Sequence, residues 1–527
     1  MCGFLITNDR HAELDLWSAA DNIAYRGPDA TAEIYRLGSY NMIFHRLAII
    51  DPGARSNQPI QLKRYSNYTL MCNGEIYNYK SLMAELDYTP ETGSDCEIII
   101  PMIEVYGVKR TCEMLDGVFA FIVHDAGKNV FYAGRDAFGV RPAFIANNGD
   151  KFGIASEAKA LINLFDNIKV FPPGTCWSSL NPRRFDRWYH YEWEEDQAMT
   201  LEQASEGTRH HLMNAVQKRM MSDRPLGSLL SGGLDSSLIA ALAQSYSDAP
   251  IETFSIGMPG SPDLDYADIV AKHIGSTHAR VELSANDFLG AIEDTIWRTE
   301  SYDTTTIRAS VGNWLVSKYI SENSNIKVVF NGDGSDEVTM GYAYNALAPN
   351  DIAFSNENKR LLREIHLFDV LRSDRSVSSC GLEPRTPFLD KAFVDFYMSI
   401  PTKLKRFGGK HPEKFVLRNA FKGTGLIPDS ALWRSKCAFS DGVSSSHNSW
   451  HTLVKRFVGA RLDPELFKNA STKWRHCTPQ LKESIYYRHV WELQFGESNE
   501  SLIPHFWLPR WTNIIDPSAR ELKHYKE

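Results

Sequence analysis

The residues best suited to chemistry in the second half of this chain lie in a serine-rich loop, Ser231–Ser237 (SGGLDSS). A short apolar stretch precedes the loop, and a helix-forming stretch rich in Ala and Leu follows it. Backbone N–H groups in such a loop converge on an anion, together with the positive end of the helix dipole. Gly232 and Gly233 let the backbone approach a phosphate closely, and the serine hydroxyls add donors. Asp235 suits this loop if Mg²⁺ lies between its carboxylate and the phosphates.

A second polar loop, Asn331–Glu337 (NGDGSDE), contains three acids. Asp333, Asp336 and Glu337 repel one another unless a cation lies among them. Asp336 paired with Asp235 would therefore make a site for Mg²⁺ and ATP. Each loop also has a purely structural interpretation. The serine-rich loop could be a turn whose serines cap the following helix, and the acidic loop could be a solvated turn. The serine-rich loop has no terminal Lys, which excludes the kinase-type phosphate loop.

The N-terminus carries a third candidate, Cys2. Removal of Met1 would leave Cys2 with a free α-amine, which can act as the base for its own thiol. Taken alone, a cysteine at this position is equally explained as an ordinary small residue. It is followed by four polar motifs, Arg26–Asp29 (RGPD), His45–Asp51 (HRLAIID), Asn73–Asn78 (NGEIYN) and Gly93–Glu97 (GSDCE).

Cys2 and these motifs resemble, in order and spacing, the glutaminase domain of the class II, N-terminal-nucleophile amidotransferases. The resemblance implies glutamine hydrolysis with Cys2 as the nucleophile. The planar guanidinium of Arg46 suits the carboxylate of glutamine, and Asp95 suits its ammonium. A surface ion pair between Arg46 and Asp95 is the alternative interpretation.

The resemblance assigns the remaining glutamine contacts to the NGE sequence. Asn73 and the backbone N–H of Gly74 would form an oxyanion hole for the tetrahedral intermediate. Glu75 would hold polar groups of the substrate.

The serine-rich loop resembles the pyrophosphate loop of the ATP pyrophosphatases, which split ATP into AMP and pyrophosphate. Together with further motifs it resembles the family of glutamine-hydrolysing asparagine synthetases over essentially the whole chain. These motifs are Gly257–Leu264 (GMPGSPDL), Tyr302–Ser310 (YDTTTIRAS), Glu383–Asp390 (EPRTPFLD), Trp433–Lys436 (WRSK) and Phe439–Gly442 (FSDG). The resemblance implies that aspartate and ATP give β-aspartyl-AMP and pyrophosphate, and that ammonia then gives asparagine and AMP. It also implies an internal ammonia tunnel between two domains and, as a family expectation alone, a homodimer.

The same resemblance assigns residues to each substrate. Lys436 suits the leaving pyrophosphate as a mobile point charge. ATP is expected at Leu229, Ser231, Gly232, Gly233, Asp235, Ser236, Ile256, Asn331 and Gly332, with Mg²⁺ between Asp235 and Asp336. Aspartate is expected at Thr305, Thr306 and Arg308, with Asp390 binding its ammonium.

One departure from the family pattern concerns Asp333. Relatives have a Glu here, which the family assigns to proton transfer in the second half-reaction. The carboxylate of Asp333 is one methylene shorter, and a misplacement of about 1 Å can cost roughly 10²-fold in rate. We therefore expect intact adenylation with slower or altered amide formation.

The elements that position these residues fall into two groups. Residues 1 to about 190 read as short strands rich in aromatic and β-branched residues, with helices near Leu16–Ala24 and Asp95–Tyr106. Stacked sheets and helices are expected there, and the resemblance implies the four-layer αββα sandwich of Ntn hydrolases, an α+β fold. From Pro225 onward strands and helices alternate, which predicts an α/β domain with a doubly wound, Rossmann-like parallel sheet and extra helices. A boundary near 195–205 gives a glutaminase domain at 1–195 and a synthetase domain at 196–527.

Composition restricts the class of protein. The chain has 527 residues, of which 43% are hydrophobic and 23% charged, which is typical of a globular protein of two or more domains. A net charge of −8 gives no basic face, so we expect no nucleic-acid partner. No apolar run approaches the roughly 18–20 residues that span a bilayer, and the N-terminus does not resemble a signal peptide. Eight scattered cysteines without a C-x-x-C pair favour a reducing, cytoplasmic location.

Two alternatives stay open. One is a synthetase of the same fold that acts on another carboxylate acceptor, although the TTIRAS sequence favours aspartate. The other is a non-catalytic protein that binds glutamine or nucleotide. The joint presence of six residues argues against it, namely Cys2, Arg46, Asn73, Asp95, Asp235 and Lys436.

Overall fold

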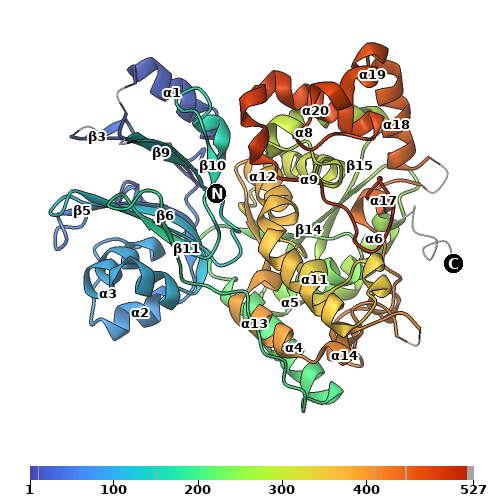
Figure 1. Cartoon of the computed structure of the whole chain (residues 1–527). Coiled ribbons are helices and arrows are strands. Elements are labelled where there is room, and N and C mark those ends of the chain that lie inside the picture. The colour runs from blue at the N-terminus through green and yellow to red at the C-terminus, as the bar shows by residue number, and fades with distance from the viewer. Residues whose placement is uncertain (10, 39, 150, 410, 446–447, 519–527) are drawn as a thin grey trace.

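The structure, a computed structural model, describes the whole chain except residues 10, 39, 150, 410, 446–447 and 519–527. Figure 1 shows two halves side by side, stacked sheets in blue to teal and a largely helical part in green to red. The last strand of the first half, β12, ends at Arg187. Helix α4 (Leu201–Lys218) then packs against α13 (Lys391–Ser399) and α15 (Phe415–Phe421) of the second half.

The first half contains two antiparallel sheets, in the strand orders β10-β8-β9-β1-β4-β2, with β3 also on β4, and β12-β11-β7-β6-β5. The strands of the first sheet are β1 (Gly3–Thr7), β2 (Ala30–Thr31), β3 (Tyr35–Leu37), β4 (Tyr40–Arg46), β8 (Phe144–Asn148), β9 (Lys151–Ala155) and β10 (Lys169–Val170). Those of the second are β5 (Tyr68–Ile76), β6 (Gly117–Asp125), β7 (Val130–Arg135), β11 (Thr175–Ser178) and β12 (Phe185–Arg187).

An apolar layer between the two sheets holds them together. Phe4 and Ile6 of β1 meet Met71 of β5 and Ile122 of β6 in this layer, and all four are at most 1% exposed. Residues two apart point to the same face of a strand, so one set of strand residues fills the layer and the other set faces the helices.

Helices cover the outer face of each sheet. On the first sheet, α1 (Glu13–Asp21) packs with Leu5 and Ile43 in one apolar cluster. On the second, α2 (Tyr79–Glu85) and α3 (Ile99–Met114) lie under β5 and β6 in Figure 1. The helix–sheet–sheet–helix order confirms the predicted sandwich.

The second half is built on a parallel sheet in the order β15-β14-β13-β16-β17. Its strands are β13 (Leu226–Leu229), β14 (Glu252–Gly257), β15 (Thr277–Glu282), β16 (Val328–Phe330) and β17 (Glu383–Arg385). The order reverses direction between β13 and β16, and ligands of doubly wound sheets bind at the carboxyl ends of the strands at such a point. This arrangement confirms the predicted fold.

Helices lie on both faces of the parallel sheet. On one face, α5 (Leu234–Ser245) shares an apolar cluster with α4 and α13. On the other, α8 (Ile292–Thr299), α9 (Thr304–Asn323) and α12 (Asp369–Ser378) share another. The remaining helices are α6 (Pro262–Ile274), α7 (Ala285–Gly290), α10 (Ser335–Thr339), α11 (Asp351–Glu364), α14 (Thr402–Lys405), α16 (Asp429–Leu432), α17 (Phe439–Gly442), α18 (Trp450–Arg461), α19 (Pro464–Lys473) and α20 (Lys482–Phe495).

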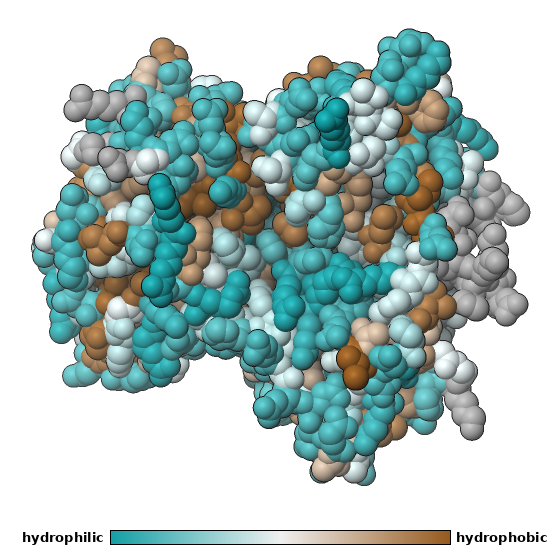
Figure 2. Space-filling model, viewed as in Figure 1, coloured by the Kyte–Doolittle hydropathy of each residue, from teal (hydrophilic) through white to brown (hydrophobic). Residues whose placement is uncertain are grey.

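The distribution of hydrophobic residues on the surface is that of a globular protein, as the composition predicts. Figure 2 shows hydrophobic residues scattered in small groups over one face, with a hydrophilic area over α11. Within the part of the chain that the structure describes, no helix is both long and apolar enough to cross a membrane.

Candidate active sites

The serine-rich loop forms the predicted anion cradle at the carboxyl end of β13. Gly233 is the N-cap of α5, so the free N–H groups of the first helical turn face the loop. The hydroxyls of Ser231 and Ser236 lie 2.9 Å apart, and the Ser231 N–H donates to Ser236 Oγ at 3.1 Å. Gly232 has a φ of +67°, and a Cβ there would lie 2.4 Å from Tyr266. Only glycine fits this turn, which brings the backbone within reach of a phosphate.

The acidic loop touches the serine-rich loop. A Cβ on Gly332 would lie 2.9 Å from Asp235 Cβ and from the backbone nitrogen of Ser236. The Ser335 hydroxyl donates to Asp235 Oδ1 at 2.9 Å. The two predicted loops therefore form one site.

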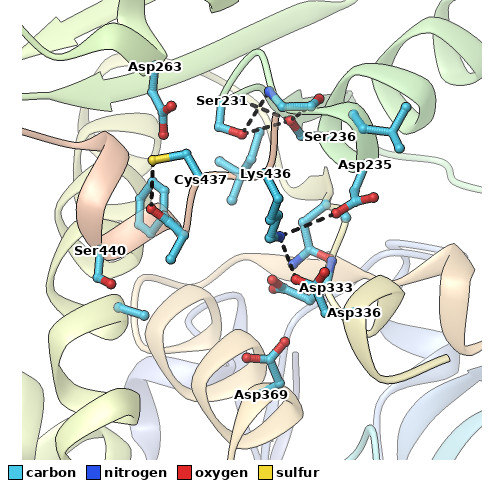
Figure 3. A pocket seen from close by; sticks show the side chains of 18 of the residues that line it. Ser231, Asp235, Ser236, Asp263, Asp333, Asp336, Asp369, Lys436, Cys437 and Ser440 are labelled. Atoms are coloured by element: carbon cyan, nitrogen blue, oxygen red, sulfur yellow. Dashed lines mark hydrogen bonds and ion pairs between the residues drawn. The ribbon is translucent and has the colours of Figure 1, made fainter. Parts of the chain in front are cut away.

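Two lysines bind the paired carboxylates of Asp235 and Asp336. Lys414 Nζ lies 2.6 Å from Asp235 Oδ2 and 2.6 Å from Asp336 Oδ1. Lys436 Nζ lies 2.6 Å from Asp336 Oδ2 and 3.8 Å from Asp235 Oδ2, and Figure 3 shows it between the two acids. Burial alone would raise the pKa of Asp336, but Lys414 and Lys436 outweigh it and hold the pKa below its usual range.

Sequence reasoning found Lys436 but missed Lys414, which is 2% exposed. Lys414 is the N-cap of α15 and has a φ of 59°. Its surroundings in the chain, Gly409 to Phe415 (GKHPEKF), contain no phosphate-binding pattern. The sequence offered one signal for such a lysine, the number of acids in the two loops. Several buried carboxylates require a nearby positive charge, which a lysine can supply as well as a metal.

These groups line a cavity of about 260 Å³. The predicted residues that line it are Leu229, Ser231, Gly233, Asp235, Ser236, Ile256, Thr305, Thr306, Asn331, Gly332, Asp333, Asp336 and Lys436. The cavity thus brings together the residues expected for ATP, except Gly232, with part of the set expected for aspartate.

The end of the cavity away from the serine-rich loop contains charged residues that the sequence did not single out. Arg372 Nη2 lies 2.7 Å from Asp333 Oδ1 and 3.0 Å from Asp369 Oδ1. Figure 3 shows Asp369 beyond Asp333, on the side away from Ser231. Asp369 and Arg372 both lie on α12, one turn apart, and only the fold brings them to the acidic loop.

Glu337 and Tyr342 also line this end, and the hydroxyl of Tyr342 donates to Glu337 Oε1. Glu337 Oε2 is buried and has no hydrogen-bond partner among the described residues. Burial, with Asp369 and Asp336 nearby, raises the pKa of Glu337 well above its usual value. An unpaired acid facing the cavity suits a cationic or hydrogen-bonding group of a ligand.

Two residues predicted for aspartate lie outside this cavity. Arg308 is 5% exposed on α9, and its guanidinium binds Glu483 at 2.5 Å and Asp516 at 2.7 Å. Asp390 caps α13 and pairs with Arg219 at 2.6 Å. Neither residue lines the cavity, so the structure does not bring Arg308 and Asp390 to the site as the sequence predicted.

In the first half, Asn73 lies beside Cys2. The Cys2 N–H donates to Asn73 Oδ1 at 3.1 Å. Asn73 Nδ2 is buried with no acceptor in the described part of the chain, so it is available as an oxyanion donor. A Cβ on Gly74 would lie 2.3 Å from the carbonyl oxygen of Val118, so only glycine fits beside Asn73.

Met1 still precedes Cys2 in this structure and is 1% exposed. Its amine donates to the carbonyl oxygen of Leu382 at 3.3 Å, across the interface between the halves. Burial raises the pKa of the Cys2 thiol to about 11, although the Met1 amine and Arg46 oppose this shift. The thiol therefore needs a neighbouring base, which the Cys2 α-amine would supply after removal of Met1.

Arg46, Glu75 and Asp95 lie on separate elements, and Arg46 is close enough to Cys2 to act on the pKa of its thiol. Arg46 is the last residue of β4, and its guanidinium donates to the carbonyl oxygens of Gly53 and Asp51 in the following loop. Asp95 Oδ2 accepts the Ile76 N–H at 2.6 Å, and burial raises the pKa of Asp95 to about 6. Burial, then Glu383 and Asp95, raise the pKa of Glu75 well above its usual value.

Buried ion pairs join the two halves of the molecule next to Cys2. Arg26, which is 0% exposed, donates to the Cys2 carbonyl oxygen at 2.9 Å. It also pairs with Asp374 of α12 at 2.9 Å. Because α12 also carries Arg372, one helix contacts both sites.

Comparisons with known proteins place the chain in a family. A model of the glutamine amidotransferase domain matches residues 1–175, and a model described as asparagine synthase matches residues 207–363 and 348–503. The chain belongs to the asparagine synthase family. The glutamine-hydrolyzing asparagine synthetases of Homo sapiens and Gallus gallus are 41% and 40% identical, over 100% of this chain and 99% of their own lengths. A solved glutamine phosphoribosylpyrophosphate amidotransferase from B. subtilis, complexed with ADP and GMP, is 16% identical at a TM-score of 0.31, over 47% of this chain and 64% of that one.

Proposed function

We propose that this chain makes asparagine from aspartate and ATP, with glutamine or free ammonia as nitrogen donor. The observation that carries the proposal is the pairing of Asp235 and Asp336 with Lys414 and Lys436 at the serine-rich loop, in the same chain as a Cys2 site. A loop of this kind binds a pyrophosphate group, and the lysines neutralise it as it leaves.

In the first half-reaction, the β-carboxylate of aspartate attacks the α-phosphorus of ATP. The N–H groups of Gly232 and Gly233 and the hydroxyl of Ser236 bind the leaving pyrophosphate. Lys414 and Lys436 neutralise the charge that develops on it. Leu229 and Ile256, at or next to the ends of β13 and β14, line the cavity and would bind the adenine.

Asp235 and Asp336 fit Mg²⁺. Mg²⁺ is usually held by one or two carboxylates together with substrate phosphates and water. Two facing carboxylates meet that need, although no group of three or more His, Cys, Asp or Glu side chains gathers as a metal site among the described residues. When bound, Mg²⁺ would neutralise phosphate charge.

Aspartate binds at the far end of the cavity. Arg372 suits its α-carboxylate, and Asp369 and Glu337 suit its ammonium. Thr305 and Thr306, on the first turn of α9, line the cavity between this end and ATP.

In the glutaminase half, Cys2 attacks the side-chain amide of glutamine after Met1 is removed. Its own α-amine takes the thiol proton and gives it to the nitrogen that leaves as ammonia, while Asn73 Nδ2 and the Gly74 N–H stabilise the oxyanion. Water then hydrolyses the glutamyl thioester on Cys2 to glutamate. Arg46 and Asp95 hold the two ends of free glutamine.

Ammonia then passes inside the protein to the adenylate, whose carbonyl carbon it attacks while AMP leaves. Asp333 takes a proton from the attacking nitrogen. We place the enzyme in the cytoplasm, where its cysteines, all free in the described chain, stay reduced.

The test is product analysis of the purified protein with Mg²⁺–ATP and aspartate, using glutamine or ammonium as donor. We expect asparagine, AMP and pyrophosphate in equal amounts with either donor. Cys2→Ala should abolish only the glutamine route. Pyrophosphate release that does not depend on aspartate would contradict the proposal.

A further inference from the structure

We propose that the C-terminal segment 503–518 forms one wall of the aspartate-binding end of the cavity. In this assignment Trp507 contacts the bound acceptor, and Arg308 is a positioning residue that anchors the segment through Asp516. The inference rests on the proposed function, because it names the part of the same site that recognises the acceptor.

Trp507 comes from the far end of the chain but lines the cavity together with Tyr342, Phe368 and Asp369. It is 7% exposed, and its backbone N–H donates to Asp303 Oδ2 at 2.8 Å. Figure 1 shows the red segment after α20 crossing the second half from the region of α12 towards α17. It thus reaches the end of the cavity that contains Asp369 and the unpaired Glu337.

The ring of Trp507 supports the acid proposed for the ammonium of aspartate. It packs against Tyr342, with ring centres 5.2 Å apart, and edge-on against Tyr344 at 5.9 Å. Tyr342 in turn donates to Glu337. A change in the Trp507 ring therefore alters both the shape of this end and the position of Glu337.

The segment is attached a second time at Asp516, which is 5% exposed. Asp516 accepts from Arg308 Nη1 at 2.7 Å and Nη2 at 3.1 Å, and from His451 at 2.9 Å. Glu483 of α20 binds the other side of the same guanidinium. Removal of one partner from a buried pair leaves an uncompensated charge, so this anchor resists release.

Both attachments are on α9. Asp303 is its N-cap and also accepts the Thr306 N–H at 2.8 Å, while Arg308 lies just over one turn further along. The turn between them carries Thr305 and Thr306, which face the cavity. The segment and this turn are therefore held as one unit around the acceptor, so Arg308 would act on aspartate binding without touching aspartate.

The test measures KM for aspartate, KM for ATP and the glutaminase rate in full-length variants. For Trp507→Leu and Asp516→Asn we expect KM for aspartate to rise about tenfold or more, the scale of one lost packing contact. KM for ATP and the glutaminase rate should stay within about twofold, and Asp516→Glu should recover part of the loss.

Matched controls come from the same region of the chain. Trp474 is buried away from the cavity, and Glu500 pairs with the buried Arg488. Trp474→Leu and Glu500→Gln should leave KM for aspartate unchanged. If Trp507→Leu does not fold, Trp507→Phe provides the same measurement.

An unchanged KM for aspartate in folded Trp507 and Asp516 variants, or an equal rise for ATP, would overturn the inference. Failure of the proposed function is distinguishable, because the unmodified protein would then show no aspartate-dependent pyrophosphate release.

Discussion

Asp333 offers the most specific perturbation of the proposed reaction. Its Oδ1 is held by Arg372 at 2.7 Å, while Oδ2 is buried without a partner among the described residues. Oδ2 is therefore the oxygen free to take a proton from the attacking ammonia. Asp333→Glu would carry this carboxylate further into the cavity by one carbon–carbon bond, about 1.5 Å.

The expected magnitude follows from that displacement. A misplacement of about 1 Å can cost roughly 10²-fold in a positioned catalytic step. Asp333→Glu should therefore speed ammonia-dependent asparagine formation by up to about 10²-fold. Adenylation should change less than about twofold, because the carboxylate of Asp333 pairs with Arg372 of α12, whereas the pyrophosphate is proposed to bind at the serine-rich loop.

The assay follows asparagine and pyrophosphate separately, with ammonium as donor so that the Cys2 site plays no part. Asp369→Glu is the matched control, since it lengthens the other acid that shares Arg372. It should not speed asparagine formation. An unchanged or lower rate for Asp333→Glu would refute the reasoning.

Three further predictions concern other parts of the molecule. Lys414→Met should lower aspartate-dependent pyrophosphate release by about 10²-fold or more, because two facing carboxylates lose their buried cation, while the glutaminase rate stays intact; equal loss of both activities would contradict this. Burial raises the pKa of Asp95 to about 6, so KM for glutamine should fall as pH rises from about 5 to 7 and the carboxylate ionises, and Asp95→Asn should flatten the profile. Met340 is 0% exposed with a φ of 57°, so Met340→Gly should melt above Met340→Ala in thermal unfolding, by the equivalent of about 1 kcal/mol; the reverse order would count against strain at this position.

Features formed by residues that are neighbours along the chain could be predicted from the sequence. The serine-rich loop, its strand and its helix are contiguous, so the chain pattern by itself places Ser231 and Asp235 at a sheet edge. The pairing of Asp235 with Asp336 could also be predicted, because parallel strands end at a common edge of the sheet.

Residues brought together by the fold alone were missed. Lys414, Arg372 and Trp507 reach the cavity from a loop, a helix and the C-terminal segment, and none sits in a chain pattern that marks a site. Arg308 and Asp390 show the opposite failure. Both lie in motifs that resemble the family's, yet the pairing of Arg308 with Asp516 and of Asp390 with Arg219 could not be foreseen from their neighbours.

The central claim is that this chain activates the β-carboxylate of aspartate by adenylation. Aspartate labelled with ¹⁸O in that carboxylate, incubated with the protein, Mg²⁺–ATP and ammonium, tests it most directly. One labelled oxygen should appear in the phosphate of AMP for each asparagine formed. AMP without label, or label in inorganic phosphate with ADP as product, would contradict the claim.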